Sequence, residues 1–261
     1  MQDFIGIEKT VHGRLWNAVH GGYFSDPAIA RPLVETAAGV LTRSPADVVV
    51  DLGGGTGFLL SQLASHGITA GMAMVNVDGS DAQLALTERK DISHLCVSLA
   101  DFRRGAVAAG NERCFFLMRS VFHYVGEDGL SPLLRHLRDQ AEEGEFFVHQ
   151  TASFDSEQDA ACLNALYRRM HTHKWYATVS EMKGRLAESG WRVVATAAAP
   201  ALPLTSEELI RRYGLDVGEI RRVRDAVAAE FGERDNVFAL TPSGFEAKLH
   251  YRIYTCVAQA S

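Results

Sequence analysis

The sequence predicts an α/β fold built on a parallel sheet, and three observations lead to it. Between residues 47 and 149, short apolar runs alternate with helical patterns at the spacing of right-handed β-α-β units. A glycine-rich turn, Gly53-Gly-Gly-Thr-Gly57, directly follows the first of these runs. The 261 residues, 47% hydrophobic and 22% charged, suit one large soluble globular domain with its own core.

The first part of the chain, residues 1–45, is expected to form a helical cap. A helix that starts near Pro27 and ends at Pro45 keeps its apolar residues on one face. That face carries Leu33, Ala37, Val40 and Leu41.

The predicted strands of the core are short apolar runs bounded by turn residues. The first, Asp47-Val-Val-Val-Asp51, is β-branched and stops in glycines, which is typical of a buried parallel strand. Residues 114–118 are apolar throughout and predict a central strand. The other core strands are expected at 74–78, 95–99, 145–149 and 191–196.

Helices are predicted between these strands. Gly144 closes a helix over 129–143, and Gly190 stops another over 179–189. The first of these helices repeats leucines at helical spacing, namely Leu130, Leu133, Leu134 and Leu137. Further helices are expected at 58–66, 81–90 and 159–170.

Residues 200–248 are predicted to be a helical insertion between the last two strands. Helical patterns cover 206–213 and 217–231 within it, and the final strand is expected at 249–257. Together with a core at 46–199, this organisation predicts that the whole chain is a single domain.

The charge balance argues against a nucleic-acid partner. Lysine and arginine give 26 positive charges, aspartate and glutamate give 32 negative ones, and the net charge is −6. Proteins that bind backbone phosphates usually carry a basic excess or stripe. No apolar run is long enough to span a membrane, and no signal-peptide pattern begins the chain. Four widely spaced cysteines indicate reduced thiols and a cytoplasmic location, and a homodimer is left open.

The glycine turn is the sharpest functional signal, because glycines let a ligand lie against the backbone. A dinucleotide loop reads G-x-G-x-x-G, but here the last glycine is Gly57 and Phe58 follows it. The lysine of a phosphate loop is absent. Asp51 precedes the turn, where its carboxylate would repel a pyrophosphate and attract a cation. This charge pattern favours S-adenosylmethionine (SAM), which carries a sulfonium and an ammonium group and no phosphate.

Two further acidic residues follow predicted strands. Asp78 ends the second strand, where a carboxylate can accept both hydroxyls of a ribose. Asp101 follows the third strand and could accept from an adenine amino group, while Phe102 could pack on the adenine ring. Each residue alone also fits an ordinary helix start or turn, so their order along the chain is the stronger signal.

Taken together, these segments resemble the class I SAM-dependent methyltransferases of the Rossmann-like superfamily. The matching stretches are VVVDLGGGTG (48–57), VNVDGS (75–80), LADF (99–102) and FFLMRSVFHYV (115–125). The resemblance covers roughly residues 45–196 and the final strand. It implies a seven-stranded, mostly parallel sheet with helices on both faces and an antiparallel last strand. The long insertion before that strand departs from the family pattern and leaves the substrate class open.

The resemblance also implies where SAM binds. The glycine turn and Asp51 would border its methionine part, Asp78 would hold the ribose, and Asp101 with Phe102 would flank adenine. Arg119 and Ser120 would lie beneath the cofactor. The full set of expected cofactor-binding residues is Asp51, Gly53, Gly55, Thr56, Gly57, Asp78, Gly79, Ser80, Asp101, Phe102, Arg119 and Ser120.

A small-molecule acceptor is expected. The segment after the fourth strand is neither the Asn/Asp-Pro-Pro-Tyr of amino-methylating DNA enzymes nor part of a Pro-Cys nucleophile motif. His123 and His149 follow strands, so either could act as a base or as an orienting group. The residues expected to contact the acceptor are Trp16, His20, Tyr23, Tyr124, His173, Trp175 and Tyr176. Of the whole set, Tyr23, His123 and Trp175 are predicted to face it directly.

No metal is expected. His171-Thr-His173 could join His123 or His149 around a divalent ion, but ten histidines in this chain make such a pair unremarkable. Two rival functions remain at this point. One is an NAD(P)-dependent oxidoreductase on a similar sheet, against which Asp51 and the shifted glycine count. The other is a domain that binds SAM without catalysis, because cofactor motifs report binding and not turnover.

Overall fold

The computed structural model describes residues 22–260. The strands are β1 (Val48–Leu52), β2 (Ala73–Asp78), β3 (Ile92–Cys96), β4 (Cys114–Arg119), β5 (Phe146–Phe154), β6 (Ala177–Thr178), β7 (Trp191–Thr205), β8 (Phe238–Leu240) and β9 (Phe245–Ala258). The helices are α2 (Pro27–Arg43), α3 (Phe58–Ser65), α4 (Asp81–Leu84), α5 (Gly126–Asp139), α6 (Glu157–Arg169), α7 (Val179–Glu188), α8 (Ser206–Tyr213) and α9 (Val217–Phe231). Two short 3-10 turns are η2 (Arg104–Ala106) and η3 (Phe122–Val125).

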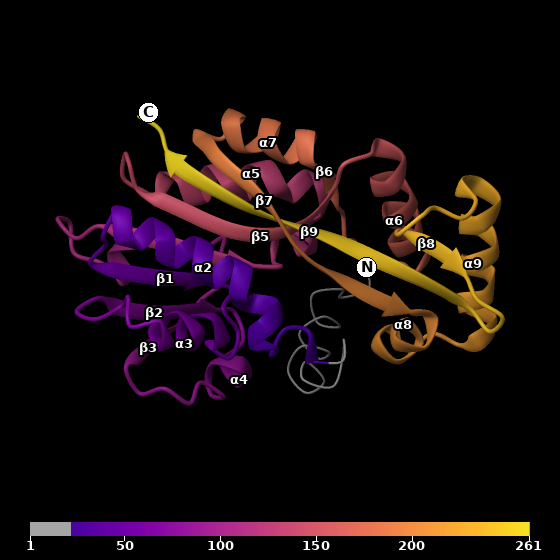
Figure 1. Cartoon of the computed structure of the whole chain (residues 1–261), viewed down its shortest axis with the longest axis horizontal. Coiled ribbons are helices and arrows are strands. Elements are labelled where there is room, and N and C mark those ends of the chain that lie inside the picture. The colour runs from indigo at the N-terminus through magenta and orange to yellow at the C-terminus, as the bar shows by residue number, and fades with distance from the viewer. Residues whose placement is uncertain (1–21, 261) are drawn as a thin grey trace.

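The main sheet runs in the order β3-β2-β1-β4-β5-β9-β7 (Figure 1). Strands β1 to β5 are parallel, and β9 lies antiparallel between β5 and β7. The predicted seven-stranded, mostly parallel sheet is confirmed, and so is its antiparallel last strand. The sequence analysis did not predict the two short strands β6 and β8. Strand β6 pairs with β5, and β8 pairs with β9.

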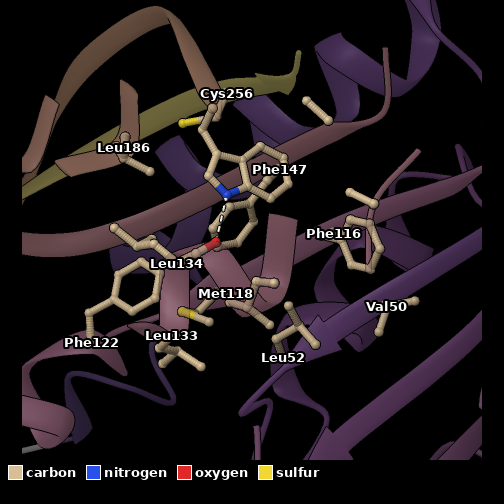
Figure 2. Close-up of a cluster of buried hydrophobic side chains, with 14 of the residues drawn as sticks. Val50, Leu52, Phe116, Met118, Phe122, Leu133, Leu134, Phe147, Leu186 and Cys256 are labelled. Carbon is tan, nitrogen blue, oxygen red and sulfur yellow. Dashed lines mark hydrogen bonds between the residues drawn. The ribbon is translucent and has the colours of Figure 1, made fainter. Parts of the chain in front are cut away.

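Helices cover both faces of the sheet. On one face, apolar residues of α5 and α7 pack on β1, β4 and β5, and Figure 2 shows part of this core around Phe147 and Met118. The Trp191 indole there donates a hydrogen bond of 3.1 Å to the Leu134 carbonyl, so its one polar group is satisfied. On the other face, α2 and α3 pack on the same strands. Burying each large apolar side chain contributes about 1.5–3 kcal/mol to stability.

A second core lies at the far end of the two longest strands. Strands β7 and β9 pair from Trp191 and Ala258 to Thr205 and Glu246, and this ribbon continues beyond the neighbouring strands (Figure 1). Apolar residues of α6, α8, α9 and β8 pack around its end. This second core contributes one wall of the pocket described below.

The boundaries of the predicted insertion at 200–248 are therefore wrong at both ends. Residues 200–205 belong to β7, and 245–248 belong to β9. Prolines at 200 and 203 conceal the strand in the sequence, but β7 lies at the edge of the sheet, where proline is tolerated. The helices predicted at 206–213 and 217–231 are confirmed.

The third strand and the helix before it also differ from the prediction. Strand β3 covers Ile92–Cys96 in place of 95–99, and α4 ends at Leu84 in place of residue 90. Strand β3 is an edge strand with mostly exposed side chains, so it lacks the apolar signature of the central strands. After α4 the chain continues in hydrogen-bonded turns, which brings Thr87 against the glycine loop.

Candidate functional site

A row of buried polar side chains crosses one face of the sheet beneath the glycine loop. Asp51 of β1 pairs in register with Asn76 of β2, and Arg119 of β4 pairs with Gln150 of β5. All four are almost completely buried. Both carboxylate oxygens of Asp51 and the amide oxygen of Asn76 lack a hydrogen-bond partner among residues 22–260. Buried polar atoms are rarely left unpaired, so this row points to a polar ligand.

The electrostatics of Asp51 favour a cation as that ligand. Burial, followed by repulsion from Asp78, raises the pKa of Asp51 from 3.8 to about 7, while Arg119 acts in the opposite direction. A positive group beside the carboxylate would stabilise its charged form and lower this pKa again. The ammonium group of SAM is such a group, and the site therefore fits the cofactor that the sequence suggests.

The glycine loop lies directly above this carboxylate. Gly53 has a φ of +73° and donates its N–H to the Val77 carbonyl at 2.7 Å, which ties the loop to β2. A Cβ on Gly54 would lie 2.3 Å from the Asn76 amide oxygen and 2.5 Å from an Asp51 oxygen. Only a residue without a side chain allows this approach. The close fit keeps the backbone low enough for a ligand to lie on it.

Asp78 is held at the edge of the same loop. One of its oxygens accepts from the Gly55 N–H at 2.9 Å, and the other accepts from the Ser80 N–H at 2.8 Å. A carboxylate oxygen can accept more than one hydrogen bond, so both oxygens retain capacity for a ribose diol. Of the neighbouring expected residues, Thr56 and Gly79 lie in the same loops, and Ser80 caps α4.

The two residues expected to contact adenine, Asp101 and Phe102, lie in different environments in the structure. Asp101 is exposed, and its carboxylate accepts from the Ser98 hydroxyl at 2.6 Å. Phe102 is fully buried in the core. Its ring is nearly perpendicular to that of Phe116, with the ring centroids 6.4 Å apart. Its ring packs within the main core, so its predicted contact with adenine stays a prediction. An aromatic residue after a strand turns inward when the core has room for it, which the sequence pattern could not distinguish.

Arg119 and Ser120 connect the cofactor side to a neighbouring pocket. The Arg119 guanidinium donates to the carbonyls of Tyr23 and Phe24 at 3.3 and 3.2 Å, and it lies over both of their rings. Ser120 adopts a φ of +61°, and its hydroxyl is 2.8 Å from the Tyr251 hydroxyl. Backbone strain of this kind at a non-glycine residue is concentrated at functional sites.

This pocket lies immediately beyond the carboxyl end of β4. It collects Phe24 from the residues before α2 and side chains from η3, α6, the segment before β6, α8 and the β7–β9 ribbon. The lining residues are Phe24, Ser120, His123, Tyr124, Tyr167, Lys174, Tyr176, Leu202, Arg212, Leu249 and Tyr251. We refer to it below as the aromatic pocket.

Three of the expected acceptor residues line the aromatic pocket. His123 and Tyr124 lie on η3, and the His123 ring stacks on Tyr176 with centroids 5.5 Å apart. The other described candidates do not line it. Trp16 and His20 fall outside the residues that the structure describes.

Tyr23, Trp175 and His173 do not line the aromatic pocket, and their predicted contact with the acceptor stays a prediction. The Tyr23 hydroxyl donates to the Pro200 carbonyl and its ring stacks on Tyr251, so Tyr23 lies behind the pocket wall. Trp175 packs against the main core beneath the Arg185 guanidinium. His173 is exposed.

His149 is a core residue. It is completely buried among the rings of Phe122, Phe147 and Tyr254, and its Nδ1 lies 3.0 Å from the Thr151 hydroxyl. Desolvation lowers the pKa of His149 from 6.5 to about 3. A group so placed does not reach the pocket, and this geometry gives no support to the predicted role as a base.

Several pocket residues escaped the sequence reasoning. Lys174 lies between His173 and Trp175, but a lone lysine in a loop carries no signal of its own. Arg212 appears in the sequence as part of a charged helix face. In the sequence, Tyr251 is recognisable only as a residue of the final strand. Their convergence depends on how the second core packs, and no local pattern encodes it. In residues 22–260, no three His, Cys, Asp or Glu side chains are grouped to hold a metal ion.

Comparison with solved structures shows the same fold in proteins described as methyltransferases. The chain superimposes on an inferred methyltransferase of Bacillus halodurans with a TM-score of 0.65 and 11% identity, over 87% of this chain and 99% of that one. For the Burkholderia thailandensis 1,6-didemethyltoxoflavin-N1-methyltransferase, the TM-score is 0.56 and the identity 14%, over 99% and 90%. For a Thiobacillus denitrificans SAM-dependent methyltransferase with bound S-adenosylhomocysteine, the values are 0.55 and 15%, over 94% and 98%.

A comparison of the sequence with protein families settles the class. None of the curated proteins matches the sequence. The family model of the methyltransferase domain matches residues 26–196, which hold the glycine loop, Asp78 and the start of the aromatic pocket. This match decides against the oxidoreductase. The chain therefore belongs to the methyltransferase-domain family and is a SAM-dependent methyltransferase.

Proposed function

We propose that this enzyme methylates a small molecule bound in the aromatic pocket. The observation that carries the proposal is the position of that pocket. It begins at Ser120 and His123, directly after β4, and it is confined by Phe24 and by side chains from α6, the segment before β6, α8 and the β7–β9 ribbon. In open α/β sheets, ligands bind outside the carboxyl ends of the strands. A confined pocket lined mainly by aromatic rings, with a serine, a lysine and an arginine among them, suits a small ligand better than a polymer.

The cofactor residues have distinct roles in this proposal. SAM supplies a methyl group that is already activated by its positive sulfur. Asp51 binds the ammonium group, the glycine loop supports the methionine part, and Asp78 holds the ribose. Arg119 fixes the start of the pocket through its contacts with Tyr23 and Phe24. Holding the acceptor in line with the methyl group supplies much of the rate enhancement.

His123 is the candidate for orienting the acceptor or for taking its proton. It is buried, it lines the pocket, and its ring contacts Tyr124 and Tyr176. The net charge of −6 supports the absence of a nucleic-acid substrate. The Burkholderia thailandensis neighbour, whose structure holds 1,6-didemethyltoxoflavin, shows that a related fold can take a small heterocycle. In the described part of the chain, none of the helices has the length and hydropathy to cross a membrane. The four free cysteines support our placement of the enzyme in the cytoplasm.

The test uses SAM with an isotopically labelled methyl group. The enzyme is incubated separately with small-metabolite, nucleic-acid and protein fractions of a cell extract. We expect label in the small-metabolite fraction, and label found only in nucleic acid or protein would contradict the proposal. With the acceptor in hand, His123→Ala should lower turnover far more than SAM affinity. His66→Ala, which changes an exposed histidine after α3, is the matched control and should alter neither.

A further inference from the structure

Two buried polar side chains on β4 and β5 have hydrogen-bonding atoms without a partner. Arg119 and Gln150 pair in register where β4 ends. Gln150 is completely buried, and neither its amide nitrogen nor its amide oxygen has a hydrogen-bond partner among residues 22–260. The Arg119 Nε is also buried without a partner in the described part of the chain. Buried donors are rarely left unpaired, so this pair indicates a ligand that carries acceptor atoms.

The contacts that Arg119 makes within residues 22–260 are with uncharged groups. Its guanidinium donates to the carbonyls of Tyr23 and Phe24 and lies over both of their rings. Burial lowers the pKa of Arg119, so the positive charge is costly in this position. Hydrogen bonds that involve charged groups are roughly twice as strong as neutral ones. An anionic group beside Arg119 would therefore be bound more strongly than these carbonyls are.

The Tyr23 phenol shows that Arg119 and Gln150 reach the same place. Burial raises the pKa of Tyr23 to about 12, while the neighbouring Arg119 and Gln150 act in the opposite direction. The phenol donates its one proton to the Pro200 carbonyl, so it does not satisfy the Gln150 amide oxygen. A positive donor and a neutral donor thus lie beside each other.

These donors lie next to the carboxylate that we assign to the ammonium group of SAM. Asp51 is opposite Leu117 on β4, and Arg119 lies two residues further along the same face of that strand. Strand spacing and rise put the Cα atoms of Asp51 and Arg119 roughly 8 Å apart. Burial raises the pKa of Asp51 and Arg119 opposes this rise, so the two charges act on each other. Acceptors on β1 and β2 beside donors on β4 and β5 match the ammonium and carboxylate groups of an α-amino acid.

We propose that Arg119 and Gln150 bind the carboxylate of the methionine part of SAM, while Asp51 binds its ammonium group. This inference deepens the proposed function and rests on its placement of SAM. Gln150 is absent from the cofactor residues that the sequence suggested, and Arg119 was expected only beneath the cofactor. The carboxylate takes no part in methyl transfer, so both residues orient the cofactor and exchange no proton. Binding both charged groups of the amino acid fixes the direction of the sulfur relative to the aromatic pocket.

Calorimetry with two cofactor analogues tests the inference. S-adenosylhomocysteine is compared with its decarboxylated analogue, in which a hydrogen atom replaces the carboxylate. The wild type should bind S-adenosylhomocysteine about a hundredfold more tightly, because each of two hydrogen bonds to the charged group contributes about tenfold. Gln150→Leu nearly keeps the size of the side chain and removes its donors, so this preference should fall about tenfold. The affinity for the decarboxylated analogue should stay as in the wild type.

Two further variants complete the test. Arg119→Gln should also lower the preference by at least about tenfold. Arg119 holds Tyr23 and Phe24 as well, so Gln150→Leu decides the test if the arginine variant does not fold. The matched control is Thr151→Val, which removes a buried hydroxyl from the next residue of β5, on the opposite face of the sheet. It should leave the preference intact.

Equal binding of the two analogues by the wild type would overturn the inference. An unchanged preference in Gln150→Leu would do the same, and if both affinities fell together the residue would have a structural role only. These outcomes leave the proposed function standing if the labelled methyl group still enters a small molecule. Label in a macromolecule alone would instead overturn the proposed function, whatever the analogues show.

Discussion

Asp51 is unusual among the buried residues of this protein. Its carboxyl group is completely buried, and neither oxygen has a hydrogen-bond partner among residues 22–260. A buried charge without a partner destabilises the ligand-free fold. In our proposal the ammonium group of SAM compensates this cost, so the opposition between stability and binding can be measured directly.

Asp51→Asn should stabilise the ligand-free protein and weaken SAM binding. The pKa of Asp51 is about 7 in the folded protein and 3.8 in the unfolded chain, so the folded form binds the additional proton between these values. The cost of ionising Asp51 therefore grows as pH rises through this window, to roughly 4 kcal/mol above pH 7. Asparagine avoids that cost. Urea denaturation at pH 4 and pH 8 should show a gain in stability at pH 8 only.

Calorimetry completes this experiment. The asparagine variant should bind SAM at least about tenfold more weakly, because a charge-assisted hydrogen bond of about 1.5–3 kcal/mol is lost. A variant that binds SAM as well as the wild type would remove Asp51 from the cofactor site. A variant that is no more stable at pH 8 would show that Asp51 has a partner in the folded protein.

At the scale of elements, we propose that the glycine loop separates β1 from the cofactor. Its backbone is fixed to β2 by hydrogen bonds from Gly53 and Gly54 to the Val77 carbonyl. The loop therefore cannot rise to admit a side chain without losing these bonds. Gly54 tests this constraint more directly than its neighbours do, because its φ lies outside the left-handed region and only contact opposes a side chain.

Gly54→Ala should destabilise the protein and reduce SAM affinity together. The new methyl group would meet the Asn76 and Asp51 side chains, and overpacking of this kind costs about 1–3 kcal/mol. Gly105→Ala is the control, since a Cβ there meets nothing within 4 Å. Thermal unfolding with and without S-adenosylhomocysteine measures both effects. Equal behaviour of the two variants would show that the loop is free to move.

The elements also show what the sequence can predict. The glycine loop and Asp78 are recognisable because their chemistry is local, with strand, turn and acid adjacent in the chain. Prolines at 200 and 203 conceal the extension of β7, because proline disrupts a central strand. It is tolerated here because β7 lies at the edge of the sheet. Arg212 and Tyr251 reach the pocket only through the packing of the second core. The sequence around His149 is apolar whether the histidine lies inside a strand or at its end. Only the structure shows that it lies inside β5 and points into the core.

For the molecule as a whole, two buried groups give opposite dependences of stability on pH. His149 has a folded pKa of about 3, below its ordinary value of 6.5, so the unfolded chain binds more protons between these values. Its contribution to stability is lost as pH falls through this window. Asp51 acts in the opposite direction over much of the same range. The wild type should therefore respond weakly to pH between about 4 and 6.5.

Replacing His149 should reveal the pH dependence of stability that Asp51 causes, because the opposing effect of the histidine is removed. Relative to wild type, His149→Phe should gain about 2 kcal/mol of unfolding free energy between pH 7 and pH 5, because the histidine penalty is gone. His149→Leu is a second variant in case phenylalanine overfills the site. Methyl transfer at pH 7.5 should persist in whichever variant folds. A difference from wild type that does not change with pH would mean that His149 is not buried in the neutral form.

The division into two cores has a consequence for how such enzymes diversify. The proposed cofactor residues Asp51 and Asp78 lie in the parallel half, whereas α8 at the tip of the β7–β9 ribbon brings Arg212 to the aromatic pocket. Mutation, insertion or recombination between residues 206 and 244 can therefore reshape one wall of the pocket while the glycine loop stays as it is. A segment from another protein could be inserted between β7 and β9 without changing the strands themselves. An inherited module for methyl donation can in this way be recombined with new selectivity for the molecule that is modified.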